Sequence, residues 1–584
     1  MQTLLTLFRD LFSRAIKQAF PAEFIESDLI EITPSTSEKF GHYQCNSAMK
    51  LAKMLQQPPR AVAQAIVTHL EHLPSVSEWV EKLEIAGPGF INMTVRAEYL
   101  AQRVNSMLHE PYFDLTRSEK KEKIVVDFSS PNVAKEMHVG HLRSTVIGDS
   151  LCRLFEFYGD DVLRLNHLGD WGTAFGMLIA YMKEEHADVL KGTRTCELSE
   201  LMEWYKASKK RFDEDEEFKK RSQLEVVALQ SGEPDSQAAW NKIVDISRRA
   251  YCQIYQLLDV KIIDRGESFY NPLLKALVHD LDVKGLVTIS DGAKCVYLEG
   301  FKNREGELLP LMVQKSDGGF NYDTTDLAAL RQRVDEEKAD RLIYVTDQGQ
   351  GNHFAMIFKA GENAGYVDPK KVRLDHVGFG LVLGADGKKF KTRSGEVEKL
   401  IDLLTTAISH AKKIISERTP ELSAEEQEKN AIVLGINAVK YADLSCNRHH
   451  DYVFSYDKML RFEGNTASFL LYAYVRILSI KRRVAVPESV LAETAIVLTH
   501  PSEINLALHL CRFGETLEQM KQDLLPNHLT DYLYNLAEYF NAFFRDCRVE
   551  GSPEQNSRWL LCDLTARLIQ QGFDILGLKT LERM

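Results

Sequence analysis

Apolar residues change their spacing twice along the chain, which indicates three regions of different structure. The first region shows helical spacing from Leu4 to Ile16 and two shorter helical patterns on either side of Pro58 and Pro59. Strand-like runs occur at residues 30–32 and 90–95. The pattern predicts a small α+β domain over residues 1–117.

The second region, residues 118–395, alternates between strand-like and helix-like segments. Runs rich in β-branched residues occupy 124–128, 161–165 and 342–346, with further short runs at 296–298 and 311–313. This alternation predicts one doubly wound parallel sheet of the Rossmann type, with ligands at the carboxyl ends of its strands. Residues 184–258 are charged and helical, and we expect them to form an insertion between the halves of the sheet.

From residue 396 to residue 584 the apolar spacing is almost wholly helical and predicts an all-α bundle. A chain of 584 residues exceeds what one hydrophobic core organises, which agrees with a multidomain protein. No transmembrane helix is predicted, because no apolar run reaches 18 residues. The amphipathic opening could suggest a transit peptide, but it carries Asp10 and lacks a small-residue cleavage site, so we interpret it as a domain's first helix.

Charge and cysteine content restrict the possible functions only in part. The formal charge of −12 does not favour nucleic-acid binding, although local lysine and arginine clusters could still form a basic face. Nine cysteines without a C-x-x-C pair argue against a disulfide framework and a zinc ribbon, and they favour a reducing cytoplasm. Cys446, His449 and His450 could hold a metal, but no second cluster completes four ligands.

The most informative segment joins a predicted strand to a predicted helix. Residues 124–128 end at Ser129, Ser130 and Pro131, and a helix is predicted from about Gly140 to Gly159. Between them lies the tetrapeptide HVGH, at residues 138–141, whose two histidines offer N–H donors at the positive end of a helix dipole. This arrangement predicts a nucleotide site, although such histidines can also be simple caps.

The sequence around HVGH narrows the interpretation. FSSPNVAKEMHVGHLRST, at residues 128–145, resembles the HIGH signature of class I aminoacyl-tRNA synthetases in its arginyl-specific form. GDWG at 169–172, AGPGFINMTV at 86–95 and ASFLLYAYVRILSI at 467–480 resemble other parts of the same family. The resemblance covers essentially the whole chain. It implies an enzyme that uses ATP to activate L-arginine as arginyl-adenylate and transfers the arginyl group to the 3′ end of tRNA(Arg).

The resemblance also implies a set of substrate-binding residues. A planar guanidinium calls for carboxylates in bidentate geometry. The positions implied for arginine binding are Asn132, Glu267, Tyr322, Asp326 and Gln350. The positions implied for ATP binding are His138, Gly140, His141, His376 and Gly378. Tyr322 and Asp326 are four residues apart and would share one helix face.

Catalysis in this family relies on positioning and on cations near the phosphates. The loop ADGKKFKTRSGE departs from the family-wide KMSKS signature but contains Lys391 and Arg393. Many arginyl enzymes instead carry a lysine ahead of the HIGH motif, and Lys135 has that position. The expected catalytic set is therefore Lys135, His138, His141, Lys391 and Arg393. Mg²⁺ is expected to arrive with the nucleotide, without protein metal ligands.

Contacts with tRNA are expected at both ends of the chain. Phe90 and Asn92 match the base-stacking aromatic and the polar residue of the family's N-terminal domain, although a core phenylalanine and a turn asparagine are the alternative. Ala86 stands where some members have asparagine. The C-terminal bundle resembles the anticodon-binding domain, but the sequence does not identify the side chain that contacts the anticodon. A cytoplasmic monomer is the family expectation.

Two other functions are compatible with the same resemblance. The first is a non-catalytic RNA-binding paralogue, and intact Lys135, His138 and His141 argue against it. The second is another class I adenylate-forming enzyme, which the N-terminal domain and the absence of zinc motifs disfavour.

Overall fold

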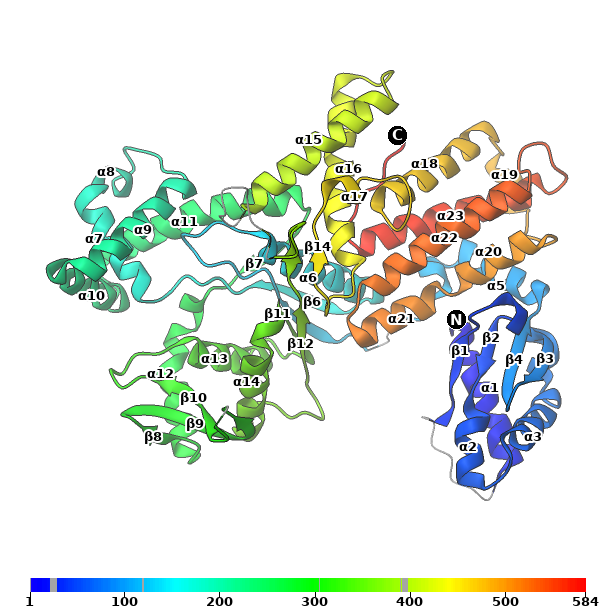
Figure 1. Cartoon of the computed structure of the whole chain (residues 1–584), viewed down its shortest axis with the longest axis horizontal. Coiled ribbons are helices and arrows are strands. Elements are labelled where there is room, and N and C mark those ends of the chain that lie inside the picture. The colour runs from blue at the N-terminus through cyan, green and yellow to red at the C-terminus, as the bar shows by residue number, and fades with distance from the viewer. Residues whose placement is uncertain (1, 22–28, 118–119, 304, 389, 391–397) are drawn as a thin grey trace.

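The computed structural model describes residues 2–21, 29–117, 120–303, 305–388, 390 and 398–584. A small N-terminal domain lies at one end of an elongated molecule, beside the C-terminal helices (Figure 1). The parallel sheet lies at the centre, and two further lobes extend from it on the side away from the N-terminal domain.

The N-terminal domain combines helices with one antiparallel sheet of strand order β1-β2-β4-β3. Its strands are β1 (Ile32–Pro34), β2 (Tyr43–Cys45), β3 (Val80–Ala86) and β4 (Phe90–Val95). Its helices are α1 (Leu4–Ala19), α2 (Ser47–Leu55), α3 (Pro59–Glu71), α4 (Pro74–Trp79) and α5 (Ala97–His109), with short turns η2 (Glu38–Phe40) and η3 (Pro111–Asp114). The predicted α+β class is confirmed, and the first strand begins two residues later than expected.

The central sheet contains five parallel strands in the order β12-β11-β5-β6-β7. The strands are β5 (Lys123–Asp127), β6 (Asp161–Asn166), β7 (Ile263–Asp264), β11 (Arg341–Asp347) and β12 (Arg373–Phe379). Helices α6 (Val139–Tyr158), α12 (Glu267–Val283), α13 (Tyr322–Asp335) and α14 (Gly351–Asn363) accompany them. The strand order reverses between β5 and β11, which makes the carboxyl end of this pair the expected ligand crevice of a doubly wound sheet.

Two predicted strands were assigned to the wrong sheet. Residues 296–298 and 311–313 belong to β9 (Ala293–Lys302) and β10 (Leu308–Gln314), which form a separate antiparallel sheet with β8 (Thr288–Ser290). A turn at Asp291 and Gly292, both with positive φ, joins β8 to β9 directly. Strands joined by such a turn pair antiparallel, because a parallel pair needs a long crossover.

The predicted helical insertion is present between β6 and β7. It consists of α7 (Thr173–Glu185), α8 (Ala187–Leu190), α9 (Leu198–Glu214), α10 (Glu216–Gln230) and α11 (Pro234–Leu257). Four of these helices form a lobe away from the sheet, and α11 runs from that lobe back to the sheet (Figure 1).

The C-terminal third is helical, as predicted, apart from β14 (Tyr452–Val453), which pairs with β13 (Val382–Leu383). Its helices are α15 (Leu400–Arg418), α16 (Ala424–Leu444), α17 (Tyr456–Met459), α18 (Ala467–Arg483), α19 (Glu488–Ala492), α20 (Pro501–Cys511), α21 (Phe513–Asp523), α22 (Asn527–Asp546) and α23 (Gln555–Ile575). Among the described residues, no helix is both long and apolar enough to span a membrane.

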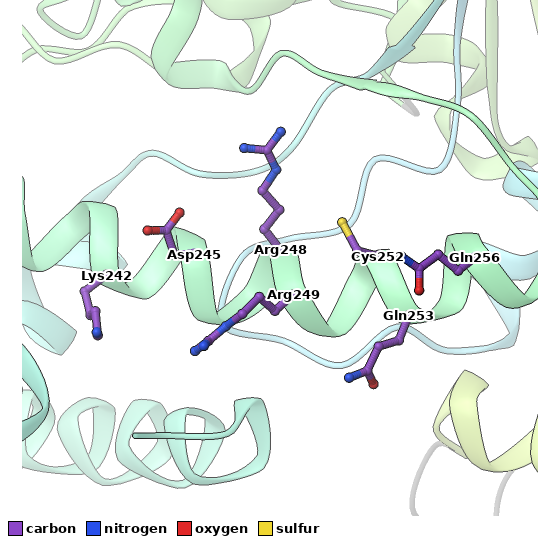
Figure 2. Close-up of a pocket in the computed structure, with 7 residues that line it drawn as sticks. All are labelled: Lys242, Asp245, Arg248, Arg249, Cys252, Gln253 and Gln256. Atoms are coloured by element: carbon purple, nitrogen blue, oxygen red, sulfur yellow. The ribbon is translucent and has the colours of Figure 1, made fainter. Parts of the chain in front are cut away.

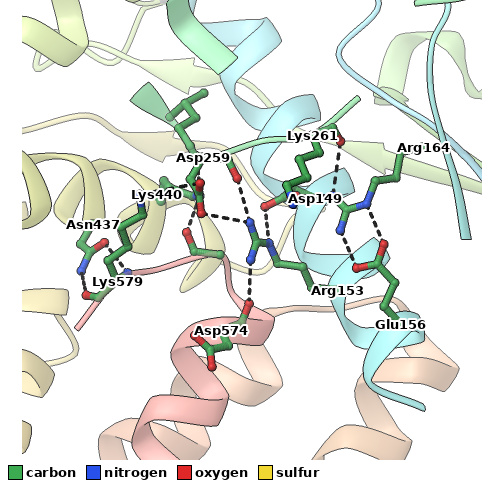
Figure 3. A network of polar contacts seen from close by, with 12 residues as sticks. Asp149, Arg153, Glu156, Arg164, Asp259, Lys261, Asn437, Lys440, Asp574 and Lys579 are labelled. Carbon is green, nitrogen blue, oxygen red and sulfur yellow. Dashed lines mark hydrogen bonds and ion pairs between the residues drawn. The ribbon is translucent and has the colours of Figure 1, made fainter. Parts of the chain in front are cut away.

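A polar network fastens this helical third to the domain that contains the parallel sheet (Figure 3). Lys440 on α16 is 1% exposed, and its ammonium donates to the carbonyl oxygens of Leu258 and Gly577. Burial lowers the pKa of Lys440 to about 8. The fully buried Asp149 on α6 accepts from Arg153 and Arg164 in the same network. The network therefore joins α6, the end of α11 and the C-terminal segment.

Candidate active site

The candidate site is the carboxyl edge of β5, β11 and β12, where a doubly wound sheet is expected to bind its ligand, and we call this region the crevice. Strand β5 leads into a loop, residues 128–138, in which Ser129, Ser130 and Ala134 have positive φ values of 72°, 49° and 62°. Such conformations are costly for residues other than glycine and persist only where surrounding contacts impose them. The loop ends at His138, where α6 begins.

The two histidines of the HVGH motif form a reciprocal cap at the start of α6. The Nδ1 atom of His138 accepts the Gly140 N–H at 3.1 Å, and the Nδ1 atom of His141 accepts the His138 N–H at 3.0 Å. A Cβ on Gly140 would lie 2.9 Å from the His138 ring, so glycine permits this packing. Burial lowers the pKa of His141 to about 3, so its ring is neutral at pH 7. Because Nδ1 accepts, Nε2 of the neutral ring carries the proton and can donate to an anion.

Helix α11 holds the backbone of the loop in front of these histidines. The Tyr251 hydroxyl lies 2.7 Å from the carbonyl oxygens of both Asn132 and Lys135. Ser247 Oγ accepts the Ala134 N–H at 3.0 Å, and Tyr255 contacts the hydroxyl of Ser129. The Asn132 and Lys135 side chains themselves are exposed. The sequence analysis did not predict a role for Tyr251. Hydroxyl residues at 247, 251 and 255 have helical spacing, and this pattern could have indicated a polar face on the helix.

A cluster of carboxyl groups lies beside the loop. Glu267 is the first residue of α12, and Asp326 is on the second turn of α13. Burial, followed by the charges of Asp326 and Asp170, raises the pKa of Glu267 to about 8. A half-buried carboxyl with acidic neighbours favours a cationic ligand, because a cation relieves their mutual repulsion.

His353 on α14 is the histidine that bridges this cluster. Its Nε2 lies 2.7 Å from Asp326, and its Nδ1 lies 3.2 Å from Asp323. Burial alone lowers the pKa of His353, but its hydrogen bonds and ion pairs with both carboxylates outweigh burial and raise it to about 9. His353 is therefore cationic at pH 7 and holds Asp326 in place. Sequence reasoning missed it, although it lies three residues after the predicted Gln350.

The GDWG loop, residues 169–172, connects Asn132 to the start of α12, where Glu267 lies. Gly169 forms a bridge with Asn132, and a Cβ on Gly169 would lie 2.2 Å from the Asn132 Oδ1. The Asp170 carboxylate accepts the Ser268 N–H at 2.8 Å and its hydroxyl at 2.7 Å. The loop thus fixes the end of β5 against the start of α12, in keeping with a shaping role.

The remaining candidates on the described part of the sheet meet at the same edge. The His376 ring stacks on Phe354, and its Nε2 lies 2.8 Å from the Thr346 hydroxyl. A Cβ on Gly378 would lie 2.3 Å from a side-chain oxygen of Gln348, so the backbone passes very close there. Tyr322 is 61% exposed and its ring contacts His353 edge-on. Gln350 is exposed at the start of α14.

Other candidates lie elsewhere. Lys391 and Arg393 fall outside the described residues. Phe90 and Asn92 are on β4 in the N-terminal domain; Asn92 is 4% exposed, and its amide oxygen accepts from Gln44 at 2.8 Å. Within the described ranges, no three histidine, cysteine, aspartate or glutamate side chains are grouped to hold a metal ion, and this includes the set around Cys446.

A shallow pocket of about 550 Å³ lies on α11 (Figure 2). It is lined by one helix, with Lys242, Arg248, Arg249 and Cys252 among its residues. Arg248 is already paired with Asp264 at 2.8 Å. By helical spacing, most of this lining lies away from the face that carries Ser247 and Tyr251, so the pocket is separate from the crevice.

Three family models match consecutive parts of the chain: "Arginyl tRNA synthetase N terminal domain" over residues 6–95, "tRNA synthetases class I (R), catalytic domain" over 103–456, and "DALR anticodon binding domain" over 470–584. The chain is 64% identical over 588 residues to the arginine–tRNA ligase of Protochlamydia amoebophila and 53% identical over 582 residues to that of Chlamydia caviae, with 100% of each chain covered.

Two solved structures resemble the whole fold. The arginyl-tRNA synthetase of Plasmodium falciparum is 33% identical, with a TM-score of 0.87 and 100% of both chains covered. That of Thermus thermophilus is 23% identical, with a TM-score of 0.79 over 99% of this chain and 100% of the other, and it supports the fold.

Proposed function

The chain belongs to the arginyl-tRNA synthetases, the class I ligases that charge tRNA(Arg) with arginine for protein synthesis, and we propose that its chemistry takes place in the crevice between β5 and β11. Membership of the family implies the use of ATP. The observation that carries the assignment of the crevice is the carboxyl cluster of Glu267 and Asp326 on the same edge of the sheet as the HVGH motif.

In this proposal the guanidinium of arginine binds the carboxyl cluster. Glu267 and Asp326 accept its N–H groups, and Asn132, Tyr322 and Gln350 surround the rest of the amino acid. Three features support the placement: the raised pKa of Glu267, the fixed position of Asp326 against His353, and the bridge of Asn132 to Gly169. An entering cation would restore the ionised form of Glu267.

ATP would bind beside the arginine, with its phosphates at the start of α6. The Nε2–H groups of His138 and His141 donate to phosphate oxygens, and Gly140, His376 and Gly378 contact the rest of the nucleotide. Lys135 supplies the cation that the missing KMSKS signature would otherwise supply, together with Lys391 and Arg393. Mg²⁺ enters with the phosphates, as it does in phosphoryl chemistry generally.

The reaction then needs no protein nucleophile. The carboxylate of arginine attacks the α-phosphorus of ATP, and pyrophosphate leaves to give arginyl-adenylate. The terminal ribose hydroxyl of tRNA(Arg) next attacks the activated carbonyl, and AMP leaves with the bonding electron pair. The residues of the crevice position the reactants and stabilise charge on the phosphates.

We propose the following division of the rest of the chain. Residues 1–117 contact tRNA through Phe90 and, once its bond to Gln44 opens, through Asn92. Residues 118–395 carry out catalysis, and residues 396–584 bind the anticodon. The change from a mixed to a helical architecture after β13 supports the second boundary. The protein is proposed to work as a monomer in the cytoplasm.

Arginine-dependent ATP–pyrophosphate exchange, measured with and without tRNA(Arg), tests this proposal. Lys135→Ala is expected to lower the exchange rate by about 100-fold, because a cation at the phosphates is removed. Lys209→Ala, an exposed lysine on α9, is the matched control and should keep the rate. No exchange in either condition, from folded protein that binds tRNA, would contradict the assignment and favour a non-catalytic RNA-binding protein.

A further inference from the structure

A second pocket lies at the opposite edge of the catalytic sheet from the candidate active site. It has a volume of about 670 Å³ and lies among the segment that leads into β5, the amino ends of β11 and β12, and helix α21. We call it the junction pocket. Strand β11 has seven residues, so at about 3.3 Å per residue the junction pocket lies about 20 Å from the carboxyl ends of the strands.

The junction pocket is rich in cationic side chains. Seven lysine or arginine residues and three carboxylates line it, although the whole chain has a formal net charge of −12. The cationic lining includes Arg117, Arg341, Lys370, Lys371, Arg373 and Lys521. The carboxylates of the lining are Glu122, Asp340 and Glu518.

Arg341 contributes a buried donor that lacks an acceptor. Its residue is 4% exposed, its Nε donates to Asp375 at 2.7 Å, and its guanidinium lies over the ring of Phe155. Its Nη2 has no hydrogen-bond partner among the described residues. Protein atoms enclose that nitrogen, so a ligand would contact the part of the Arg341 guanidinium that lines the junction pocket.

Carboxylates outside the lining hold several cations in fixed directions. Asp375 also accepts from Arg373 at 2.9 Å, and Asp160 lies 3.4 Å from the Lys521 ammonium. Lys370 and Lys371 are exposed at the rim. Cations that are oriented in this way resemble a prepared anion site more than a solvated surface.

We propose that the junction pocket binds the phosphate groups of a polyphosphate, with Arg341 at its floor and Lys370 and Lys371 at its rim. Guanidinium and ammonium groups recognise phosphate oxygens through charge-assisted hydrogen bonds, and the volume exceeds what one phosphate fills. A free nucleoside polyphosphate and the backbone of an RNA both carry phosphate groups that could bind in this way. A ligand there would contact the catalytic sheet and α21 together.

Calorimetric titration of the full-length protein with inorganic tripolyphosphate tests the proposal. The active site is first filled with a sulfamoyl analogue of arginyl-adenylate, which carries no phosphate. We expect one equivalent of tripolyphosphate to bind, with an affinity that falls as salt is added. Lys370→Ala/Lys371→Ala should weaken the binding about tenfold or more, and the exposed pair Lys209→Ala/Lys210→Ala on α9 is the matched control.

Arg341→Lys provides a second variant, because it keeps a positive charge while it removes the planar guanidinium. It should also weaken tripolyphosphate binding. The Lys370→Ala/Lys371→Ala protein should keep the melting temperature of the wild type, which shows that its loss of binding does not come from unfolding. Addition of tRNA distinguishes the sources of phosphate: displacement of tripolyphosphate identifies an RNA backbone, and persistence identifies a free polyphosphate. The proposal would be overturned if the wild type did not bind tripolyphosphate. It would also be overturned if Lys370→Ala/Lys371→Ala and Lys209→Ala/Lys210→Ala bound it equally well.

Discussion

At the scale of single residues, the site is defined by groups whose protonation differs from that of the free side chains. Burial keeps His141 neutral, whereas paired carboxylates keep His353 charged. Among the described residues Glu267 has no such cationic partner, and its carboxyl retains its proton up to about pH 8. The site is electrostatically incomplete until a cation arrives, and in our account that cation is the guanidinium of arginine.

The affinity for arginine should therefore depend on the protonation of Glu267. The free enzyme holds Glu267 with a pKa of about 8, and the bound guanidinium requires its ionised form. Binding must release a proton below pH 8, so arginine should bind about tenfold more weakly at pH 6.5 than at pH 8. Calorimetric titration at both pH values checks this expectation.

Glu267→Gln is the control for that experiment, because titration of the ligand's own amino group affects both proteins equally. The variant should bind arginine more weakly at pH 8 and lose most of the additional pH dependence. An identical pH profile in the two proteins would show that Glu267 is not in contact with the guanidinium.

Sequence strings predicted the histidines and the carboxylates that we propose for the site, since these residues lie inside distinctive motifs. They did not identify His353 as the partner of Asp326. The two residues lie on different helices, α14 and α13, and only the fold brings them together. The neutral state of His141 was also unpredictable, because it depends on burial by residues distant in the sequence.

At the scale of elements, α11 connects the helical lobe to the loop at residues 128–138. Its Tyr251 and Ser247 bind the backbone of the loop that presents Lys135. Strand runs correctly predicted β5, β6 and β11 of the central sheet, but they did not predict β12. They placed 296–298 and 311–313 in the wrong sheet, because strand direction depends on connections that periodicity does not reveal.

Tyr251→Phe tests the supporting role of α11. The variant loses one hydroxyl at two carbonyl oxygens, which should lower the free energy of unfolding by about 1 kcal/mol. It should also lower kcat for pyrophosphate exchange by about tenfold, with little change in KM for arginine, because Lys135 is displaced from the phosphates.

Tyr366→Phe is the matched control, since its hydroxyl bonds Asp280 at 2.6 Å, away from the crevice. That variant should lose similar stability and keep kcat. Equal kcat values in both variants would mean that Tyr251 stabilises the fold without positioning Lys135.

At the scale of the whole molecule, buried polar contacts join parts of the chain that are hundreds of residues apart. Arg143 on α6 pairs with Asp443 on α16 at 3.2 Å, and both side chains are buried. The network of Lys440, also on α16, contains Asp149 of α6 and the carbonyl oxygen of Leu258 (Figure 3). No local pattern in the sequence predicts such pairs, although the helical class of each partner segment was predicted.

Lys440→Met should weaken the attachment of the C-terminal helices to the catalytic domain. The substitution leaves the carbonyl oxygens of Leu258 and Gly577 without their donor, so the free energy of unfolding should fall by about 2 kcal/mol. Lys579→Met removes an exposed lysine of the same network and should cost less. Scanning calorimetry compares the two, and equal melting temperatures would contradict the role of Lys440.

The most direct test of the account is a crystal structure of the protein with a non-hydrolysable analogue of arginyl-adenylate. We expect the guanidinium within hydrogen-bond distance of Glu267 and Asp326, and the group that replaces the phosphate next to the Nε2 atoms of His138 and His141. A guanidinium bound away from both carboxylates, or an analogue outside the crevice between β5 and β11, would contradict the account.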